Sequence, residues 1–197
     1  EKGVYRPCRA GEEPKVTKSR IYLHDKSGAR KSTGTYFTKE FAVEHLLNHA
    51  LEPALREHFE RLDKLDDDDA AERFFDFRVA DIAMGSGHFL VAAVDHIEQG
   101  FTQYLSRRPL SGVRAELAKL RGSAADALGK LAEQVEIEDT QLLRRLIARR
   151  CIYGVDLNPV AVTLARVSIW IHTFVPGLPL SLLDHNLTCG NSLVGIG

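Results

Sequence analysis

Two glycines and an aspartate stand where the sequence could bind a ligand. They lie in the run Asp81-Ile82-Ala83-Met84-Gly85-Ser86-Gly87-His88-Phe89, where a predicted strand ends and a helix begins. Glycines at such a turn let the backbone approach a ligand that a side chain would exclude. The run lacks the third glycine of a dinucleotide fingerprint and the Gly-Lys-Ser/Thr ending of a phosphate-binding loop. The spacing therefore favours a ligand without a pyrophosphate or triphosphate.

Two acidic strand ends narrow the choice of ligand. Asp81 would repel a polyphosphate, but its carboxylate suits the ammonium group of an amino acid. Asp156 ends a second apolar run and could accept hydrogen bonds from ribose hydroxyls, as such acids do in nucleoside-binding α/β folds. Either acid could instead cap the helix that follows it. Together the two acids favour a positively charged nucleoside as the ligand. S-adenosylmethionine fits, because it combines ribose, adenine, an amino acid and a sulfonium and has no phosphate.

The histidines and cysteines are weaker candidates. His45 and His49 are four residues apart, which could place two metal ligands on one helical face. The sequence offers no third metal ligand near them, so we expect the two histidines to face solvent. His88, at the mouth of the glycine turn, suggests a polar contact at a helix end rather than catalysis. The three cysteines show no Cys-x-x-Cys spacing, so we expect neither a disulfide framework nor a bound metal.

Alternating strands and helices would position these residues. The predicted core elements are a strand over Phe74–Ala83, a helix over Phe89–Leu105, a helix over Gln141–Arg150, a strand over Cys151–Asp156, and a helix from Asn158 and Pro159 to about Phe174. The last helix is apolar nearly all round, so we expect it to be deeply buried, with Trp170 in the core. This order predicts an α/β fold with a largely parallel sheet.

The remaining segments divide the chain into regions. Residues 1–34 form a basic polar arm, which could contact nucleic-acid phosphates or pair with the acidic stretch that follows. Residues 35–73 hold a helix with Thr38 as N-cap and Pro53 as a kink or end. Asp66–Asp69 is predicted to be a solvated loop in the acidic linker that ends this region. Residues 74–197 are the first part of an α/β domain, with a helical hairpin inserted at about 106–138.

Composition excludes a wholly disordered, a collagen-like and a disulfide-scaffold protein. The 197 residues are 44% hydrophobic and 27% charged with a formal net charge of −1, as in an ordinary globular protein. No apolar run approaches the ~20 residues that span a membrane, and the first residues lack a signal-peptide pattern. We therefore expect a cytoplasmic protein without a membrane partner.

Four segments together resemble the adenine-N6 DNA methyltransferases of the large single-chain restriction–modification and phage-defence type. Thr33–Thr38 is similar to their Gly-x-Tyr-Tyr/Phe-Thr motif, and Asp81–Phe89 to their Asp-Pro-Ala-Cys-Gly-Ser-Gly-x-Phe motif. Tyr153–Pro159 is similar to their ribose-binding strand, and Cys189–Leu193 to the segment near adenine. Ile82 and Met84 depart from the usual Pro and Cys, and Asn191 stands where an Asp is common.

The resemblance implies a truncated Rossmann-like fold of the S-adenosylmethionine-dependent methyltransferases. The parent enzyme would transfer a methyl group to the exocyclic amine of a flipped-out adenine, and would contact DNA mainly through parts beyond these residues. S-adenosylmethionine is the implied cofactor. The implied cofactor-binding residues are Thr35, Tyr36, Thr38, Asp81, Ala83, Gly85, Gly87, Phe89, Asp156, Leu157 and Asn191.

No catalytic residue is implied within these 197 residues. They lack the Asn/Asp-Pro-Pro-aromatic motif of the family, and Asn158-Pro159-Val160 is favoured as a helix cap. Because the sheet also has few strands, we expect a fragment of a longer protein that does not methylate DNA alone. Two alternatives stay open: a nicotinamide-dependent oxidoreductase domain, and a non-catalytic nucleoside-binding module.

Overall fold

The computed structural model describes residues 38–179 and 186–194. Contacts divide the chain after Tyr36, and every described residue belongs to the unit Phe37–Gly197. Its elements are α2 (Glu40–Leu46), the π-helix η1 (Leu47–Leu51), α3 (Glu52–Leu62), α4 (Asp67–Arg73), β1 (Val79–Asp81), α5 (His88–Arg107), α6 (Ser111–Leu128), the 3-10 helix η2 (Gly129–Gln134), α7 (Asp139–Arg150), β2 (Ile152–Asp156), α8 (Pro159–His172) and β3 (Leu187–Cys189).

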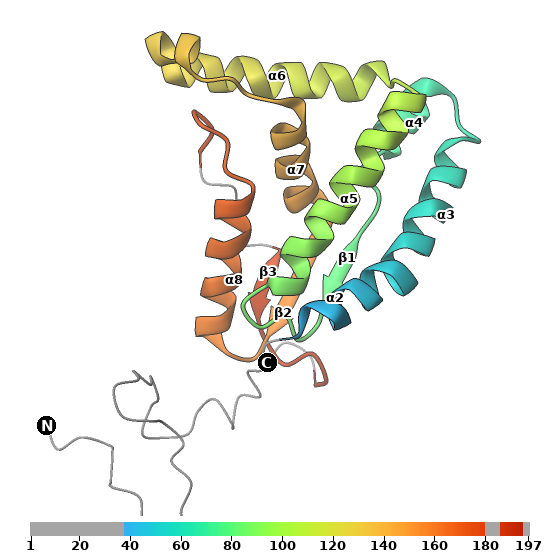
Figure 1. Ribbon diagram of the computed structural model, residues 1–197, viewed down its shortest axis with the longest axis vertical. Helices are drawn as coiled ribbons and strands as arrows, with labels where there is room; N and C mark the ends of the chain where they lie inside the picture. The colour runs from blue at the N-terminus through green and yellow to red at the C-terminus, as the bar shows by residue number, and fades with distance from the viewer. Residues whose placement is uncertain (1–37, 180–185, 195–197) are drawn as a thin grey trace, which may run out of the picture. The chain divides into compact units, whose positions relative to one another are not determined.

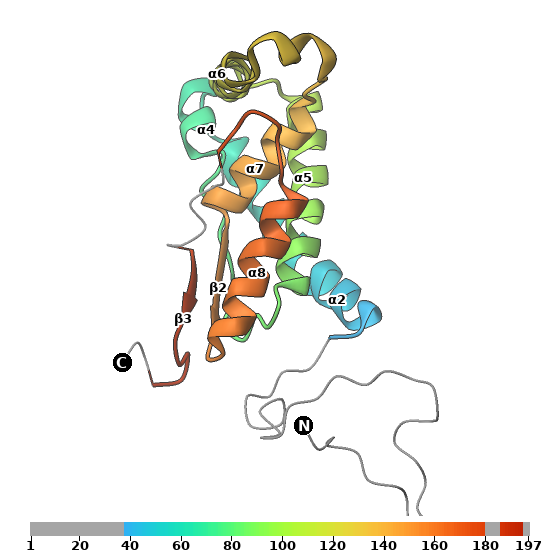
Figure 2. The same cartoon turned by 90° about the vertical axis from the view of Figure 1, so that its left-hand side faces the viewer.

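The three strands form one parallel sheet in the order β1-β2-β3 (Figure 1). Val79 pairs with Ile152, and Gly154 pairs with Leu187. Helices α5, α7 and α8 pack against the strands. In Figure 2, β2 and β3 lie on the left and these three helices on their right, so the helices cover the same face of the sheet. Because all strands run the same way, their carboxyl ends meet at one edge, beside the start of α5. This edge is where open α/β sheets bind ligands.

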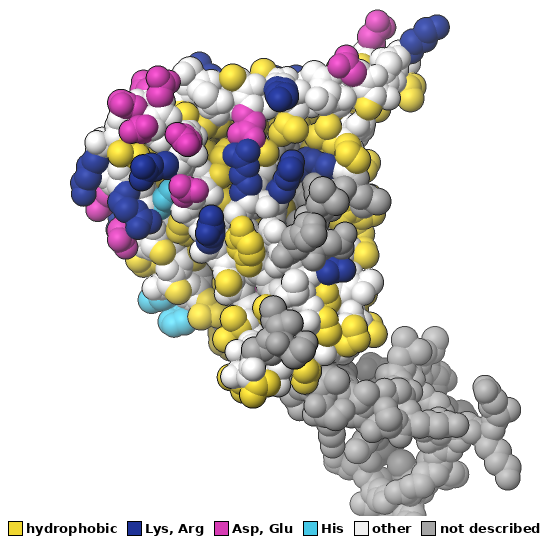
Figure 3. All heavy atoms as spheres, turned by 180° about the vertical axis from the view of Figure 1, so that it is seen from behind, with side chains coloured by type: hydrophobic (Ala, Val, Ile, Leu, Met, Phe, Trp, Pro, Cys, Tyr) yellow, Lys and Arg dark blue, Asp and Glu magenta, His cyan; other side chains and the backbone are white. Residues whose placement is uncertain are grey.

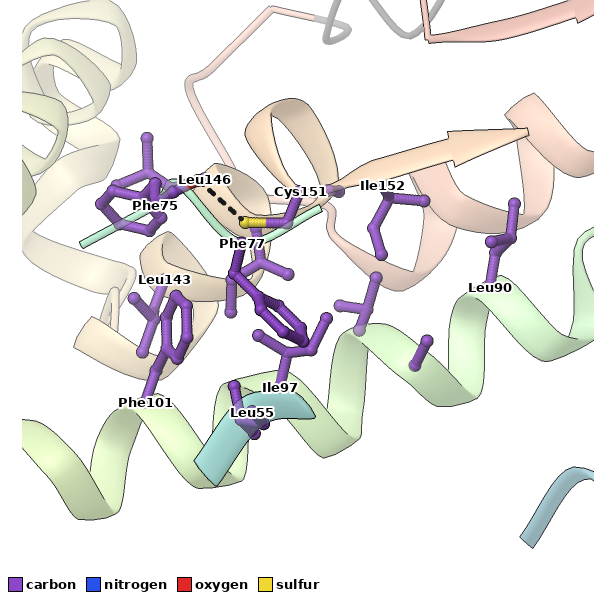
Figure 4. Packing of buried hydrophobic residues seen from close by; sticks show 14 of the residues in the cluster. Leu55, Phe75, Phe77, Leu90, Ile97, Phe101, Leu143, Leu146, Cys151 and Ile152 are labelled. Carbon is purple, nitrogen blue, oxygen red and sulfur yellow. Dashed lines mark hydrogen bonds between the residues drawn. The ribbon is translucent and has the colours of Figure 1, made fainter. Parts of the chain in front are cut away.

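The apolar stripe of α5 forms the centre of the core. The six side chains that the sequence pattern predicts for this face are all buried: Leu90, Ala93, Val94, Ile97, Phe101 and Tyr104. Figure 4 shows α5 packing against side chains from α3, α7 and the start of β2. The Cys151 thiol lies there, 3.7 Å from the carbonyl oxygen of Phe75. Burial raises its pKa to about 12, so this thiol is inert at neutral pH.

The first helical segment has an irregular middle. Four of its buried residues, Val43, Leu47, Leu51 and Leu55, recur every four positions across this middle. A spacing of four exceeds the 3.6 residues of an α-helical turn, and the wider π-helical turn at Leu47–Leu51 keeps these side chains on one face. Pro53 follows in the first turn of α3 and does not end the helical segment, which continues to Leu62. The N-cap is Lys39, not the predicted Thr38.

Three local predictions are wrong. Asp66–Asp69 is not a loop: Asp66 is the N-cap of α4 and accepts a hydrogen bond from the Asp69 amide, and the following aspartates favour the positive end of that helix. The 106–138 segment is not a helical hairpin but one long helix, α6, followed by η2. The strand predicted over Phe74–Ala83 is limited to Val79–Asp81, because Phe74 caps the C-terminal end of α4.

Helix α8 is buried on one side only, contrary to the expectation of deep burial. Ala161, Val162, Ala165 and Ile169 are buried, whereas the opposite face is open. Trp170 is half-buried and meets the Phe174 ring edge-on at 5.8 Å between centroids, so it lies at the margin of the core. Hydrophobicity on all sides of a helix predicts burial only if neighbours exist on all sides.

His58 is a buried titratable group in this core. Its side chain is 3% exposed, its Nε2 lies 3.1 Å from the Phe74 carbonyl oxygen, and Phe77 and Phe101 flank its ring. Desolvation lowers the pKa of His58 below its ordinary value. The imidazole is therefore neutral in the folded protein, with Nε2–H donating to the carbonyl group.

We expect stability to fall in acid because of His58. Below the unfolded pKa of about 6.5, the unfolded chain binds a proton that the folded chain does not. The free energy of unfolding should then fall by up to about 1.4 kcal/mol per pH unit below that value. Urea titrations of the wild type and His58→Phe between pH 7.5 and pH 5 test this. Parallel pH profiles for the two proteins would remove His58 as the cause.

Candidate functional site

Asp156 ties the glycine turn to the end of β2. Its Oδ2 accepts a hydrogen bond of 2.8 Å from the Gly85 amide, and its Oδ1 accepts one of 2.8 Å from the Asn158 amide. The Met84 amide donates to the Val155 carbonyl oxygen at 3.1 Å. These bonds fix the turn between β1 and α5 against the neighbouring strand, so the two predicted ligand-binding segments are joined directly.

Both acids keep capacity for a ligand. A carboxylate has about four acceptor sites, and the two backbone donors leave Asp156 room for hydroxyl groups. The Oδ1 of Asp81 accepts from the Ala83 amide at 3.0 Å. Its second oxygen has no hydrogen-bond partner within residues 38–179 and 186–194, and the side chain is half-buried. Asp81 could therefore receive a cation, and Asp156 neutral donors.

The two glycines of the turn have different surroundings. Gly85 has φ +55°, and a Cβ built there meets no heavy atom within 4 Å. Gly87 has φ +82°, but a Cβ there would lie 3.0 Å from the Cβ of Ala165 in α8. Both φ values are costly for other residues. Gly85 thus leaves open space where a ligand can lie, whereas Gly87 allows the start of α5 to pack against α8.

The end of β3 completes this edge of the sheet. Cys189 pairs with Asp156, and the Gly190 amide donates to the Asp156 carbonyl oxygen at 3.0 Å. The Oδ1 of Asn191 accepts from the amides of Leu193 and Val194 at 3.0 and 3.3 Å. With that oxygen engaged, the amide nitrogen of Asn191 is the group that can donate to a ligand.

Exposed hydrophobic side chains accompany these polar groups. Leu157 directly follows Asp156 and is 59% exposed, and Ile82 directly follows Asp81 and is 61% exposed. Figure 3 shows that charged side chains gather on the part of the visible face near α4, α6 and α7, while the opposite part is mostly hydrophobic and uncharged. Exposed apolar side chains beside two carboxylates suit a nucleoside better than a polyphosphate, which the carboxylates would repel.

The other predicted site residues are less clearly placed. Thr35 and Tyr36 lie outside the described residues. Thr38 is exposed and precedes Lys39, the N-cap of α2. Phe89 is half-buried and packs against the hydrophobic core.

The sequence pattern missed two supporting residues. Met84 is 4% exposed and lies behind the turn, against Gly154 of β2. The Asn158 side chain accepts a hydrogen bond of 3.0 Å from the Val160 amide, which confirms Asn158 as the N-cap of α8. The backbone amide of Asn158 also donates a hydrogen bond to the Asp156 carboxylate. The Asp-x-Asn spacing is a turn signal that could have revealed the second contact.

Other candidate chemistry finds little support. His45 and His49 are exposed and stack on each other with ring centroids 4.1 Å apart, which confirms the solvent-facing pair. Within the described ranges, no three His, Cys, Asp or Glu side chains are grouped to hold a metal ion. None of the helices in this same part of the chain is long and apolar enough to cross a membrane.

Comparison with known proteins identifies a relative of this chain. The chain is 25% identical over 202 residues to a Methanocaldococcus jannaschii protein named "Putative type II restriction enzyme and methyltransferase". The match covers 84% of this chain but only 15% of that protein. No protein-family model matches the chain. No solved structure matches it either.

Proposed function

We propose that this chain is the S-adenosylmethionine-binding part of a DNA methyltransferase in a restriction–modification or phage-defence system. The four motif segments and the similarity to a protein named a restriction enzyme and methyltransferase support this proposal. We further propose that the sheet β1-β2-β3 is the first part of a Rossmann-like methyltransferase fold. The modification would fall on N6 of adenine, which rests on the motif resemblance.

The contact between Gly85 and Asp156 is the observation that carries the proposal. It brings the glycine turn and the second acidic strand end, which are 71 residues apart in sequence, to within 2.8 Å. The open space beside Gly85 and the spare acceptor sites of Asp156 then belong to one site. This combination fits a ribose carried close to the backbone.

Each group at this edge has a role in binding. S-adenosylmethionine, when bound, supplies an electrophilic methyl group on a sulfonium. Asp156 would accept hydrogen bonds from the ribose hydroxyls, and Asp81 would pair with the ammonium group. Leu157 would cover one face of the adenine ring, and the Asn191 amide nitrogen would donate to a ring nitrogen. These side chains bind and orient the donor, and none of them takes part in proton transfer.

The acceptor would be held elsewhere in the parent protein. An adenine amine is shielded in duplex DNA, so the base must be flipped into a pocket before transfer. Asn158 cannot serve there in its present place, since its side chain caps α8 and its backbone amide holds Asp156. We therefore assign donor binding, and not transfer, to the residues of this chain, with DNA as the partner of the whole protein.

Isothermal titration calorimetry with S-adenosylmethionine, S-adenosylhomocysteine and NAD tests the proposal. Asp156→Ala should weaken binding of the two sulfur ligands by about 1.5–3 kcal/mol, because it removes charge-assisted hydrogen bonds. Asp76→Ala is the matched control: Asp76 is an exposed acid that lies before β1, away from the carboxyl edge. It should bind like the wild type.

Several outcomes would count against the proposal. Equal affinity of folded Asp156→Ala and the wild type would remove Asp156 from the site. Tighter binding of NAD than of either sulfur ligand would favour the oxidoreductase alternative. No heat with any of the three ligands, for protein that melts cooperatively, would leave no support for a nucleoside site in this chain.

A further inference from the structure

Helix α8 carries an unusual apolar stripe on its outer face. Its members recur at spacings of three or four residues and are 44–63% exposed: Val160, Leu164, Val167, Ile171 and Phe174. The stripe lies opposite the buried Ala165 and Ile169. In Figure 1, α8 is at the left end of the row formed with α7 and α5. Nothing within the described residues covers this face.

The size of the stripe argues for an interface. Five side chains that are each about half exposed leave on the order of 500 Å² of apolar surface open, as large as the largest patch on many monomers. Two such faces packed together would bury roughly 1,000 Å² in total, about the least that a specific protein interface needs. The area is sufficient for a weak, reversible pair.

The charges of α8 also permit a second copy as the partner. The helix contains no Asp, Glu or Lys. Its one arginine, Arg166, donates to the Leu187 carbonyl oxygen and so is directed toward β3. Two copies would therefore meet without like charges in the contact. An antiparallel arrangement also places the positive end of each helix dipole beside the negative end of the other.

We propose that two copies of this chain associate by packing α8 against α8, antiparallel, about a twofold axis near Val167. A twofold pair is closed, since both stripes are used completely. Val167 is the middle of the stripe, so Leu164 from one copy would approach Ile171 from the other. A hollow of about 290 Å³ beside Ile171, also lined by Val91 and His172, offers room for such a side chain.

Sedimentation velocity of the full 197-residue chain from about 1 to 200 µM tests the pairing. For an interface of this size we expect a dissociation constant on the order of 10 µM, seen as a rise from the monomer mass toward twice that value. Leu164→Glu should weaken association at least tenfold, because a carboxylate would be buried without a partner in the contact.

Leu131→Glu is the matched control, since Leu131 is 58% exposed against 51% for Leu164 but lies in η2, off the stripe. It should associate like the wild type. Circular dichroism of each variant establishes that the fold is kept. A wild type that stays monomeric at 200 µM would overturn the proposal, as would equal weakening by the two variants. A mass that passes beyond the dimer without a plateau would also overturn it, because a closed pair cannot grow.

Discussion

Gly85→Val is expected to abolish binding of S-adenosylmethionine to this chain. The Cβ of any other residue would enter the open space beside the turn, where the proposed ligand lies, and valine adds two further carbons. The φ of +55° also places a β-branched residue in a strained backbone region, so the turn itself would shift. Calorimetry with the folded variant should show no heat at ligand concentrations that saturate the wild type.

Gly129→Val separates these two effects. Gly129 has the same φ of +55°, and a Cβ there also meets no heavy atom within 4 Å, but it is the C-cap of α6 and the first residue of η2. The variant is strained at a place remote from the carboxyl edge, so it should lose stability and keep its affinity. If both variants lose binding together, the loss would come from general destabilisation, and the space beside Gly85 would have no special role.

Local sequence signals predicted the elements that carry the site. The helix expected over Phe89–Leu105 is found at His88–Arg107, and the strand expected over Cys151–Asp156 is found at Ile152–Asp156. The helix expected to start after Asn158 does so, with its predicted cap. Each has a strong local cause: a 3.6-residue apolar period, a short apolar run, or an Asn-Pro start.

The wrong predictions arise where neighbours decide the outcome. Four consecutive aspartates repel each other as a chain segment, yet at the first turn of α4 they interact favourably with the helix dipole. The glycines of 106–138 suggested breaks, but Gly112 lies within α6, where Ala71 of α4 packs closely against it. The burial of α8 depends on which elements surround it, and composition does not contain that information.

The chemistry of the candidate site was predictable only in part. The glycine turn and the two acids could be selected by residue type, because glycine and carboxylates have few substitutes in those roles. The bond from Gly85 to Asp156 depends on the register of β1 and β2 across 71 residues of chain, and no local pattern encodes it. The same holds for the engaged oxygen of Asn191, which changes the group that this side chain presents.

Gly154→Val is expected to cause the largest loss of stability among the substitutions considered for this chain. Gly154 lies in the middle of β2, and a Cβ there would overlap the sulfur of Met84 and approach Leu187 and Leu90 to 3.0 Å. All three neighbours are buried, so the added carbons cannot be accommodated by a shift into solvent. Overpacking of this kind costs about 3 kcal/mol.

The control is Gly122→Ala in α6, where an added Cβ meets no atom within 4 Å. Alanine there should stabilise the helix by about 0.5–1 kcal/mol, so the two substitutions have opposite signs in urea unfolding. Because Met84 directly precedes Gly85, any Gly154→Val protein that stays folded should also bind S-adenosylmethionine more weakly. If Gly154→Val were as stable as the wild type, the glycine turn would be able to move away from β2. The hydrogen bond between Gly85 and Asp156 would then not hold the turn rigidly.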